Sequence, residues 1–253
     1  GLLLYFFVNQ QRRFVPSDRE WDEPTWPQLL NARLRIEAIL WVLRTGAPWR
    51  DLPVYFGSWK RYDRFRAWTA NGLWTAILSM LSTQHGDNEY LMIDSTAVRV
   101  HAHGANPPGG QMAQAMGRSR SSLFTKVHVA CDALGYPLGV ILTAANVSDF
   151  DQAKPLLRQH LQPRSHALMD KGYDSDAIRA FVNQLGGFAV VPPKSNRAAK
   201  PAFDQHLYRE RHRIENLFAR LKTFRRIATR YDKLHSSFAA MFSIACIFIW
   251  LKL

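Results

Sequence analysis

The chain has 253 residues and carries 33 Lys and Arg against 20 Asp and Glu, which gives a net charge of +13 and an isoelectric point near 10.1. This excess favours a polyanionic partner such as nucleic acid, although a basic protein without a nucleic-acid role stays open on charge alone. The two cysteines form no Cys-x-x-Cys pair, so the sequence indicates neither a disulfide framework nor a cysteine zinc site. The hydrophobic fraction of 47% is that of an ordinary folded core.

Two apolar runs raise the question of membrane insertion. Residues 1–8 are few, and basic residues follow them instead of preceding them, which is the reverse of a signal peptide. Residues 238–251 fall short of the roughly 20 that a spanning helix needs. We therefore expect a buried C-terminal helix, no membrane association and a cytoplasmic protein.

The sequence predicts a small, basic, helical module over residues 1–85. The role of residues 1–27 in this module stays open. Apolar spacing predicts a helix over 28–44, ended by a Thr-Gly-Ala-Pro stop. A second helix is predicted from Ser58, as N-cap, to Thr69, and a third over 73–81. The module is similar to a helix-turn-helix, and a solvated basic face on a scaffold bundle is an equal alternative. The basic side chains of the middle helix are Lys60, Arg61, Arg64 and Arg66.

Strand-forming residues begin at residue 90 and open a second domain, over residues 86–253. Strands are predicted over residues 90–100, 124–131, 136–143, 166–169 and 188–191. Helices are predicted over residues 149–159, with Asp149 as N-cap, over 175–185 and over about 204–226. This alternation implies an α/β fold with a mixed five-stranded sheet covered on both faces, in the order of a ribonuclease H-like domain.

Two aspartates stand out because they lie in apolar strands. Asp94 is inside Leu-Met-Ile-Asp-Ser-Thr, and Asp170 ends the strand Ala-Leu-Met-Asp. A carboxylate in such surroundings is costly unless a cation compensates it, and strand ends of open α/β sheets are where ligands bind. Each aspartate alone is more often a cap, a turn residue or an ion-pair partner.

The predicted helix over 204–226 adds a third carboxylate. Tyr208, Arg211, Glu215 and Lys222 fall in one stripe about 60° wide at roughly 100° per residue, and we expect Arg226 to continue it. The stripe borders an apolar face, so Glu215 can reach a site on the sheet. A surface ladder with Arg211 and Glu215 paired is the alternative.

Carboxylates from two strands and a helix make an oxygen-only cation site. Such a site suits Mg²⁺ or Mn²⁺, and two such ions can activate a water or a 3′-hydroxyl and stabilise the leaving oxygen of a phosphodiester. We therefore predict that Asp94, Asp170 and Glu215 are metal ligands. If the three carboxylates bind metal, we expect Arg211 and Lys222 to bind phosphate, and Tyr208 to make a phosphate contact or a stacking contact.

The motifs resemble a known family. They are IDSTAVRVHAHG at 93–104, DKGYDS at 170–175, the spacing Y-x2-R-x3-E-x6-K at 208–222, RRIATRYDK at 225–233 and VLRTGAPWRDLP at 42–53. Together they resemble a bacterial insertion-sequence transposase of the DDE type, in the IS-five group of the IS-four superfamily. The resemblance covers about residues 28–251.

The resemblance implies a ribonuclease H-like fold, Mg²⁺ dependence, recognition of terminal inverted repeats and strand transfer into target DNA. It also implies a homodimer on double-stranded DNA, associated with the bacterial nucleoid. Whether a hairpin intermediate forms stays open. We expect backbone contacts from Lys60, Arg61, Arg64, Arg225 and Arg226, and Lys171 to neutralise the site or touch phosphate.

Two rival functions remain: a DNA-binding protein that kept the fold without catalysis, and a nuclease that does not join ends. His101 and His103 form a His-x-His pair, but no further ligand follows at zinc spacing, so DNA contact or structure is the favoured interpretation.

Overall fold

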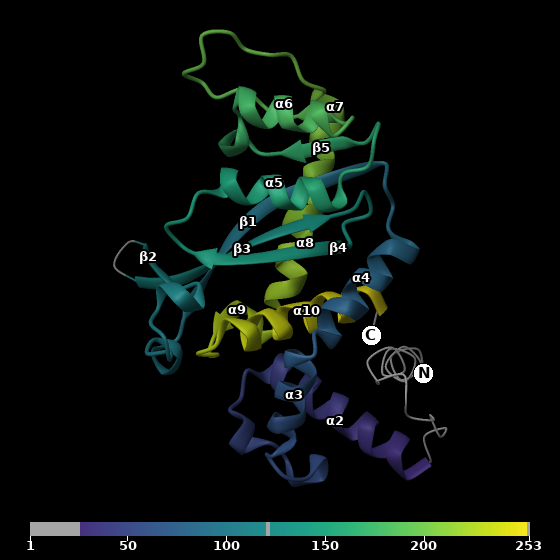
Figure 1. Ribbon diagram of the computed structural model, residues 1–253, viewed down its shortest axis with the longest axis vertical. Coiled ribbons are helices and arrows are strands. Elements are labelled where there is room, and N and C mark those ends of the chain that lie inside the picture. The colour runs from purple at the N-terminus through teal and green to yellow at the C-terminus, as the bar shows by residue number, and fades with distance from the viewer. Residues whose placement is uncertain (1–25, 120–121, 252–253) are drawn as a thin grey trace.

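The computed structural model describes residues 26–119 and 122–251, so the apolar run and the start of the chain at residues 1–25 lie outside the described residues. Figure 1 shows a mixed sheet with helices on both faces and a helical region at one end. The sheet has seven strands. These are β1 (Tyr90–Val100), β2 (Gly117–Ser119), β3 (Ser122–Cys131), β4 (Pro137–Ala144), β5 (His166–Met169), β6 (Phe188–Val190) and β7 (Thr229–Arg230).

The strand order places β1 at the centre. β3 pairs with β1 antiparallel, β5 pairs with it parallel, β4 lies beyond β3, and β6 lies beyond β5. These five strands form the mixed sheet that the sequence predicts, and the ribonuclease H-like α/β fold is confirmed. The prediction missed β2 and β7, which have three and two residues and no alternation of their own.

Each face of the sheet carries its own apolar cluster. On one face, α5 (Asp149–His160) and α6 (Asp176–Gln184) pack over Leu91 and Ile93. On the other face, α8 (His212–Lys222) packs through Ile214 and Leu217 against the cluster that contains Met92. The alternation of side chains along β1 produces this division, because successive residues of a strand point to opposite faces.

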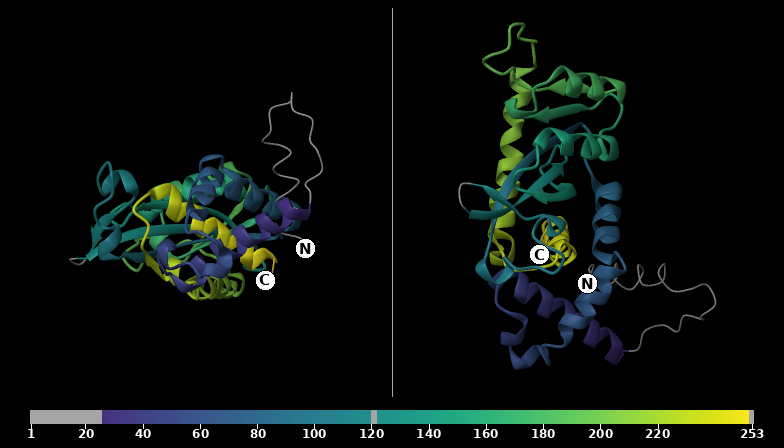
Figure 2. Two further views of the ribbon diagram at one scale, coloured as in Figure 1. Left: turned by 90° about the horizontal axis from the view of Figure 1, so that it is seen from below. Right: turned by 60° about the vertical axis from the view of Figure 1, so that its left-hand side comes forward.

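The N-terminal helices share the larger of these clusters. They are α2 (Trp26–Thr45), α3 (Arg61–Ala70) and α4 (Leu73–His85), with the short turns η1 (Trp49–Asp51) and η2 (Val54–Phe56) between α2 and α3. The predicted C-terminal helix is α10 (His235–Leu251), and it lies between α4 and the α8 side of the molecule (Figure 2). One buried cluster runs from Ile36 of α2 through Trp74 of α4 to Ile249 of α10. No helix within 26–119 or 122–251 is long and apolar enough to span a membrane.

The prediction of one unbroken helix over residues 204–226 is wrong. The segment is divided into α7 (Gln205–Tyr208), the turn η6 (Arg209–Arg211), α8 and α9 (Arg225–Ala228). The break before α9 lies at Phe224, whose ψ is 113° and whose buried ring packs 5.5 Å from that of Phe248. Arg226 therefore does not continue the polar stripe. The remaining turns are η3 (Ala102–Gly104), η4 (Met112–Gln114) and η5 (Lys171–Tyr173).

Candidate active site on the central strand

The sheet places Asp94 and Asp170 side by side. The parallel register pairs Ile93 of β1 with Met169 of β5, so the next residue along each strand is one of the two aspartates. Neighbouring strands run about 4.8 Å apart. Asp170 follows the last residue of β5, and its Oδ1 accepts a hydrogen bond from the backbone N–H of Gly172 at 2.8 Å. Two carboxylates therefore meet where β5 ends beside the middle of β1.

Burial makes the charge of Asp94 costly. It raises the pKa of the Asp94 carboxyl, and the negative charge of Asp170 raises it further. The guanidinium of Arg211 and the backbone N–H of Ser95, 2.8 Å from Oδ1 of Asp94, act in the opposite direction. The first two effects outweigh the others, so this point of the sheet favours an added positive charge.

Arg211 connects Asp94 to the helix. Its Nη2 donates to Oδ2 of Asp94, and its Nη1 donates to Oε1 of Glu215 at 3.1 Å. The Glu215 side chain is 61% exposed, whereas that of Arg211 is largely buried. One guanidinium therefore holds two of the three predicted ligands together beside the middle of β1.

Lys222 forms a second link between α8 and β1. Its Nζ donates to Oγ1 of Thr96 at 2.7 Å, two residues after Asp94. At the other end of the stripe the ring of Tyr208 lies 6.0 Å from Cζ of Arg211. Arg211 and Lys222 thus contact β1 directly, and Glu215 and Tyr208 lie beside Arg211, although the turn η6 interrupts the helix between Tyr208 and Glu215.

Comparison with known proteins gives the family of the chain. The family profile "Transposase DDE domain" matches residues 85–250, and a second profile, of transposases assigned to the IS4/5 family, matches residues 12–78. The chain belongs to the DDE transposases. It is an enzyme of the IS4/IS5 type that acts on DNA, as the sequence resemblance implies.

Individual relatives support the same family. The chain is 39% identical over 131 residues to a protein of Brucella ovis assigned as the transposase of insertion sequence element IS6501, covering 51% of this chain and all of the relative. It is 31% identical over 135 residues to one of Burkholderia cepacia assigned to IS402, covering 49% of this chain and 62% of the relative. Among solved structures, a piggyBac transposase synaptic complex with hairpin DNA shares the fold, with a TM-score of 0.54 and 11% identity over 96% of this chain and 70% of the other.

The residues present fit the divalent metal on which the family depends. The candidate donors are all carboxylate oxygens, which hard cations prefer, and burial raises the pKa of Asp94, so that a bound cation would stabilise its charged form. As the described part of the chain stands, no group of three His, Cys, Asp or Glu side chains lies close enough together to hold a metal ion. In this transposase Arg211 occupies the oxygens that Asp94 and Glu215 would offer.

The remaining sequence-predicted residues are spread over the molecule. Lys171 is exposed in η5 beside Asp170, and Arg225 is exposed at the start of α9. Lys60, Arg61 and Arg64 lie around α3, at the end of the molecule opposite α6 (Figure 1).

Arg226 is not available for the predicted DNA contact. Its side chain is buried and donates to both carboxylate oxygens of Asp232, at 3.1 and 2.9 Å, and to the backbone carbonyls of Gly46 and Ala47. The pair ties α9 to the loop that follows α2. The sequence analysis placed Arg226 on the polar stripe because it took the helix to be unbroken up to residue 226.

The sequence did not predict a polar cluster on the opposite face of the sheet. Ser148, not Asp149, occupies the N-cap position of α5. The Asp149 carboxylate instead lies 3.3 Å from Nζ of Lys126 and 3.4 Å from Nδ1 of the buried His128. Burial lowers the pKa of His128 to about 4, so its ring is neutral at pH 7. Lys126 and His128 are two residues apart on β3, so their side chains point to the same face of the sheet. This spacing is the signal in the sequence from which the cluster could have been predicted.

His101 and His103 contact each other without forming a recognisable ligand cluster. Nδ1 of His101 accepts from the backbone N–H of His103 at 3.2 Å, and the His101 ring lies 4.9 Å from that of Tyr231. These contacts close the turn after β1.

Proposed function

We propose that Asp94, Asp170 and Glu215 are the metal ligands of this transposase, and that they hold two Mg²⁺ or Mn²⁺ ions. The observation that carries the proposal is the register of β1 and β5, which makes Asp94 and Asp170 neighbours, together with the guanidinium that ties Glu215 to Asp94. When Arg211 releases Glu215, the exposed carboxylate of Glu215 on α8 becomes free to bind a metal ion.

When bound, such ions lower the pKa of an attacking water or 3′-hydroxyl and stabilise the oxygen that leaves phosphorus. The protein's part is to orient the DNA strand. Arg211, freed from its two carboxylates, and Lys222, held by Thr96, present positive charge beside the phosphodiester. Lys171, beside Asp170 in η5, and Arg225, at the start of α9, add exposed positive charge, and the ring of Tyr208 lies beside Arg211.

The substrates we propose are the terminal inverted repeats of an insertion sequence and a target duplex. The enzyme hydrolyses the phosphodiester at the transposon end and joins the freed 3′-hydroxyl to target DNA, acting on the nucleoid in the cytoplasm. A homodimer holds the two ends, so that both are cut in one complex. The net charge of +13 supports a large phosphate footprint.

The test combines a duplex from the ends of the encoding element with a target plasmid and Mg²⁺ or Mn²⁺. We expect joined product from the wild type and none above background from Asp94→Asn, Asp170→Asn or Glu215→Gln. Asp151→Asn is the matched control, because this carboxylate is exposed on α5, on the other face of the sheet. Undiminished joining by Asp94→Asn overturns the site assignment.

The same experiment separates the rival functions. Cleavage by the wild type without joining identifies a nuclease. Binding of the end duplex without cleavage identifies a DNA-binding protein that kept the fold. Size-exclusion chromatography of the protein with the end duplex tests the homodimer, since a complex with a single protein chain contradicts it.

A further inference from the structure

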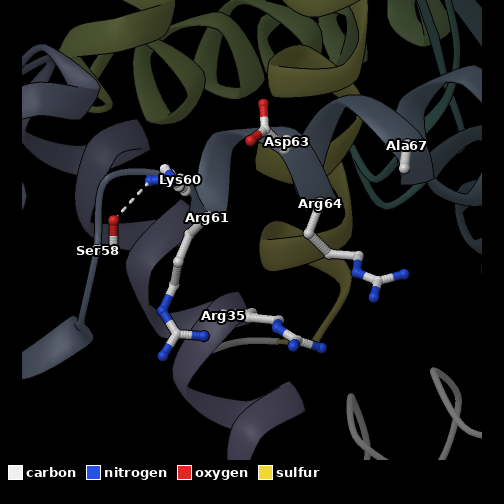
Figure 3. Close-up of a pocket in the computed structure, with 7 residues that line it drawn as sticks. All are labelled: Arg35, Ser58, Lys60, Arg61, Asp63, Arg64 and Ala67. Atoms are coloured by element: carbon white, nitrogen blue, oxygen red, sulfur yellow. Dashed lines mark hydrogen bonds between the residues drawn. The ribbon is translucent and has the colours of Figure 1, made fainter.

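A groove between α2 and α3 gathers positive charge far from the carboxylates. Figure 3 shows the guanidinium groups of Arg35, Arg61 and Arg64 directed to one side of α3, while the carboxylate of Asp63 points away from them. We call this the Arg35 groove. Its lining residues are Arg35, Ser58, Lys60, Arg61, Asp63, Arg64 and Ala67.

Arg35 lies in an unfavourable environment in the free protein. Burial lowers the pKa of its half-buried guanidinium, and the positive charges of Arg64 and Arg61 lower it further. The nearest carboxylate on the same helix, that of Glu37, is paired with Arg33 at 2.8 Å. Like charges held together at a partly buried position are compensated when an anion binds among them.

Arg61 is held in a fixed orientation. Its Nε donates to the backbone carbonyl of Phe56, and its Nη1 donates to Oδ1 of Asn31 on α2 at 3.0 Å. Its guanidinium also packs against Gly57, where an added Cβ would lie 3.1 Å from Nη2. Gly57 has a φ of 84°, so the turn both requires glycine and leaves space for the arginine. A pre-oriented guanidinium loses little conformational entropy when it binds phosphate.

Apolar side chains are exposed beside the same groove. In the segment that joins α2 to α3, Val54 is 93% exposed, Tyr55 74% and Trp59 45%. The Trp59 ring lies 5.8 Å from the guanidinium carbon of Arg50. Large exposed apolar side chains in one short segment mark an interaction surface, and next to clustered cations they suit the sugars and base edges between phosphates.

We propose that the Arg35 groove binds the phosphate backbone of duplex DNA, with Arg35 as its central residue and the segment 54–59 as its apolar border. This inference rests on the proposed transposase function and names a second place where the DNA is held. In this part of the chain the sequence analysis expected backbone contacts only from Lys60, Arg61 and Arg64. Arg35 comes from a different helix.

Equilibrium binding of a fluorescein-labelled, mixed-sequence duplex in EDTA over a salt series tests the groove. We expect Arg35→Gln and Arg64→Gln each to weaken binding about tenfold and to reduce the slope of log K against log salt by about 0.9, the value for one lost phosphate contact. The matched controls are Arg33→Gln, whose side chain is paired with Glu37, and Arg66→Gln, which lies against Tyr62 on α3. These controls should change binding less than twofold.

Thermal melting separates a binding role from a structural one. Arg35 sits among like charges, so Arg35→Gln should melt at or above the wild-type temperature while it binds DNA more weakly. Arg64 is exposed, so Arg64→Gln keeps the fold in any case. Unchanged affinity and slope in Arg64→Gln and Arg35→Gln overturn the groove. Losses equal to those of the two controls overturn it too, because they indicate net charge alone.

These outcomes are distinct from failure of the proposed function. EDTA removes the divalent metal, so the carboxylate site does not enter the measurement. A wild type with no affinity for duplex DNA contradicts both proposals. If Arg35→Gln binds the duplex as tightly as the wild type does, only the groove proposal is contradicted. Tighter binding of single strands than of duplex, with the same dependence on Arg35, also overturns it.

Discussion

Arg211 and Asp94 lie 117 residues apart in the chain and share a hydrogen bond between Nη2 and Oδ2. The same guanidinium bonds Glu215, so a single cation occupies the oxygens of two candidate metal ligands. Under the proposed assignment of metal ligands, a metal ion and Arg211 would compete for these carboxylates in the DNA-free enzyme.

Removing the Arg211 charge should strengthen metal binding. For Arg211→Gln without DNA we expect about tenfold tighter Mn²⁺ binding, equivalent to roughly 1.4 kcal/mol of competing attraction. Isothermal titration calorimetry measures it, with Arg209→Gln as control because Arg209 is exposed on the same turn. Equal or weaker binding by Arg211→Gln rules out the competition.

Thr96 should matter to catalysis through Lys222. Thr96→Val removes the hydroxyl that accepts from Nζ of Lys222 and keeps the shape of the side chain. We expect single-turnover cleavage of the end duplex to slow about tenfold in Lys222→Gln, which removes the positive charge, and less in Thr96→Val, which removes only one acceptor of that charge. A rate in Lys222→Gln equal to that of the wild type excludes this role.

The buried pair of Arg226 and Asp232 should contribute to stability. Arg226→Met leaves the Asp232 carboxylate buried without its partner, which typically costs about 3–5 kcal/mol. Urea unfolding measures the loss, with the exposed neighbour in Arg225→Met as control. A similar free energy of unfolding in both variants shows that the pair is not structural.

Acid should destabilise the protein through His128. Burial depresses its folded-state pKa to about 4, below the unfolded value of about 6.5, against the attraction of Asp149 and with the repulsion of Lys126. The unfolded state therefore binds the extra proton, and the stabilisation is present above about pH 6.5 and lost as the pH falls toward 4. The full effect is on the order of 3 kcal/mol.

Urea unfolding between pH 4 and 7 measures this dependence. His128→Gln should show a shallower rise of the free energy of unfolding with pH than the wild type. His160, whose pKa burial also lowers to about 4, supplies a parallel contribution that persists in that variant. Identical slopes for wild type and His128→Gln contradict the assignment.

The sequence predicted what local pattern determines. β1 and β5 begin and end at the predicted residues, because both are rich in strand-forming side chains. The spacing of Tyr208, Arg211, Glu215 and Lys222 predicted one stripe, and the contacts of Arg211 and Lys222 with β1 agree with it.

What the sequence missed depends on packing between distant segments. Nothing local ends the helix at Phe224, where neither glycine nor proline occurs; the ring turns inward against Phe248 of α10. Arg35 could not be grouped with Arg61 and Arg64 because a helical pattern relates residues of one helix only. The bridge from Arg211 to Asp94 likewise joins a helix to a strand.

The core that α2, α4 and α10 share joins helices from the two ends of the described chain in one buried cluster. Phe238, Phe242 and Ile247 of α10 fill the space between the first helices and the sheet. A nascent chain still lacking α10 leaves those apolar faces open, and such exposed surfaces attract chaperones and proteases. The N-terminal helices and the sheet that carries the candidate carboxylates therefore complete their common core only when α10 has packed against both.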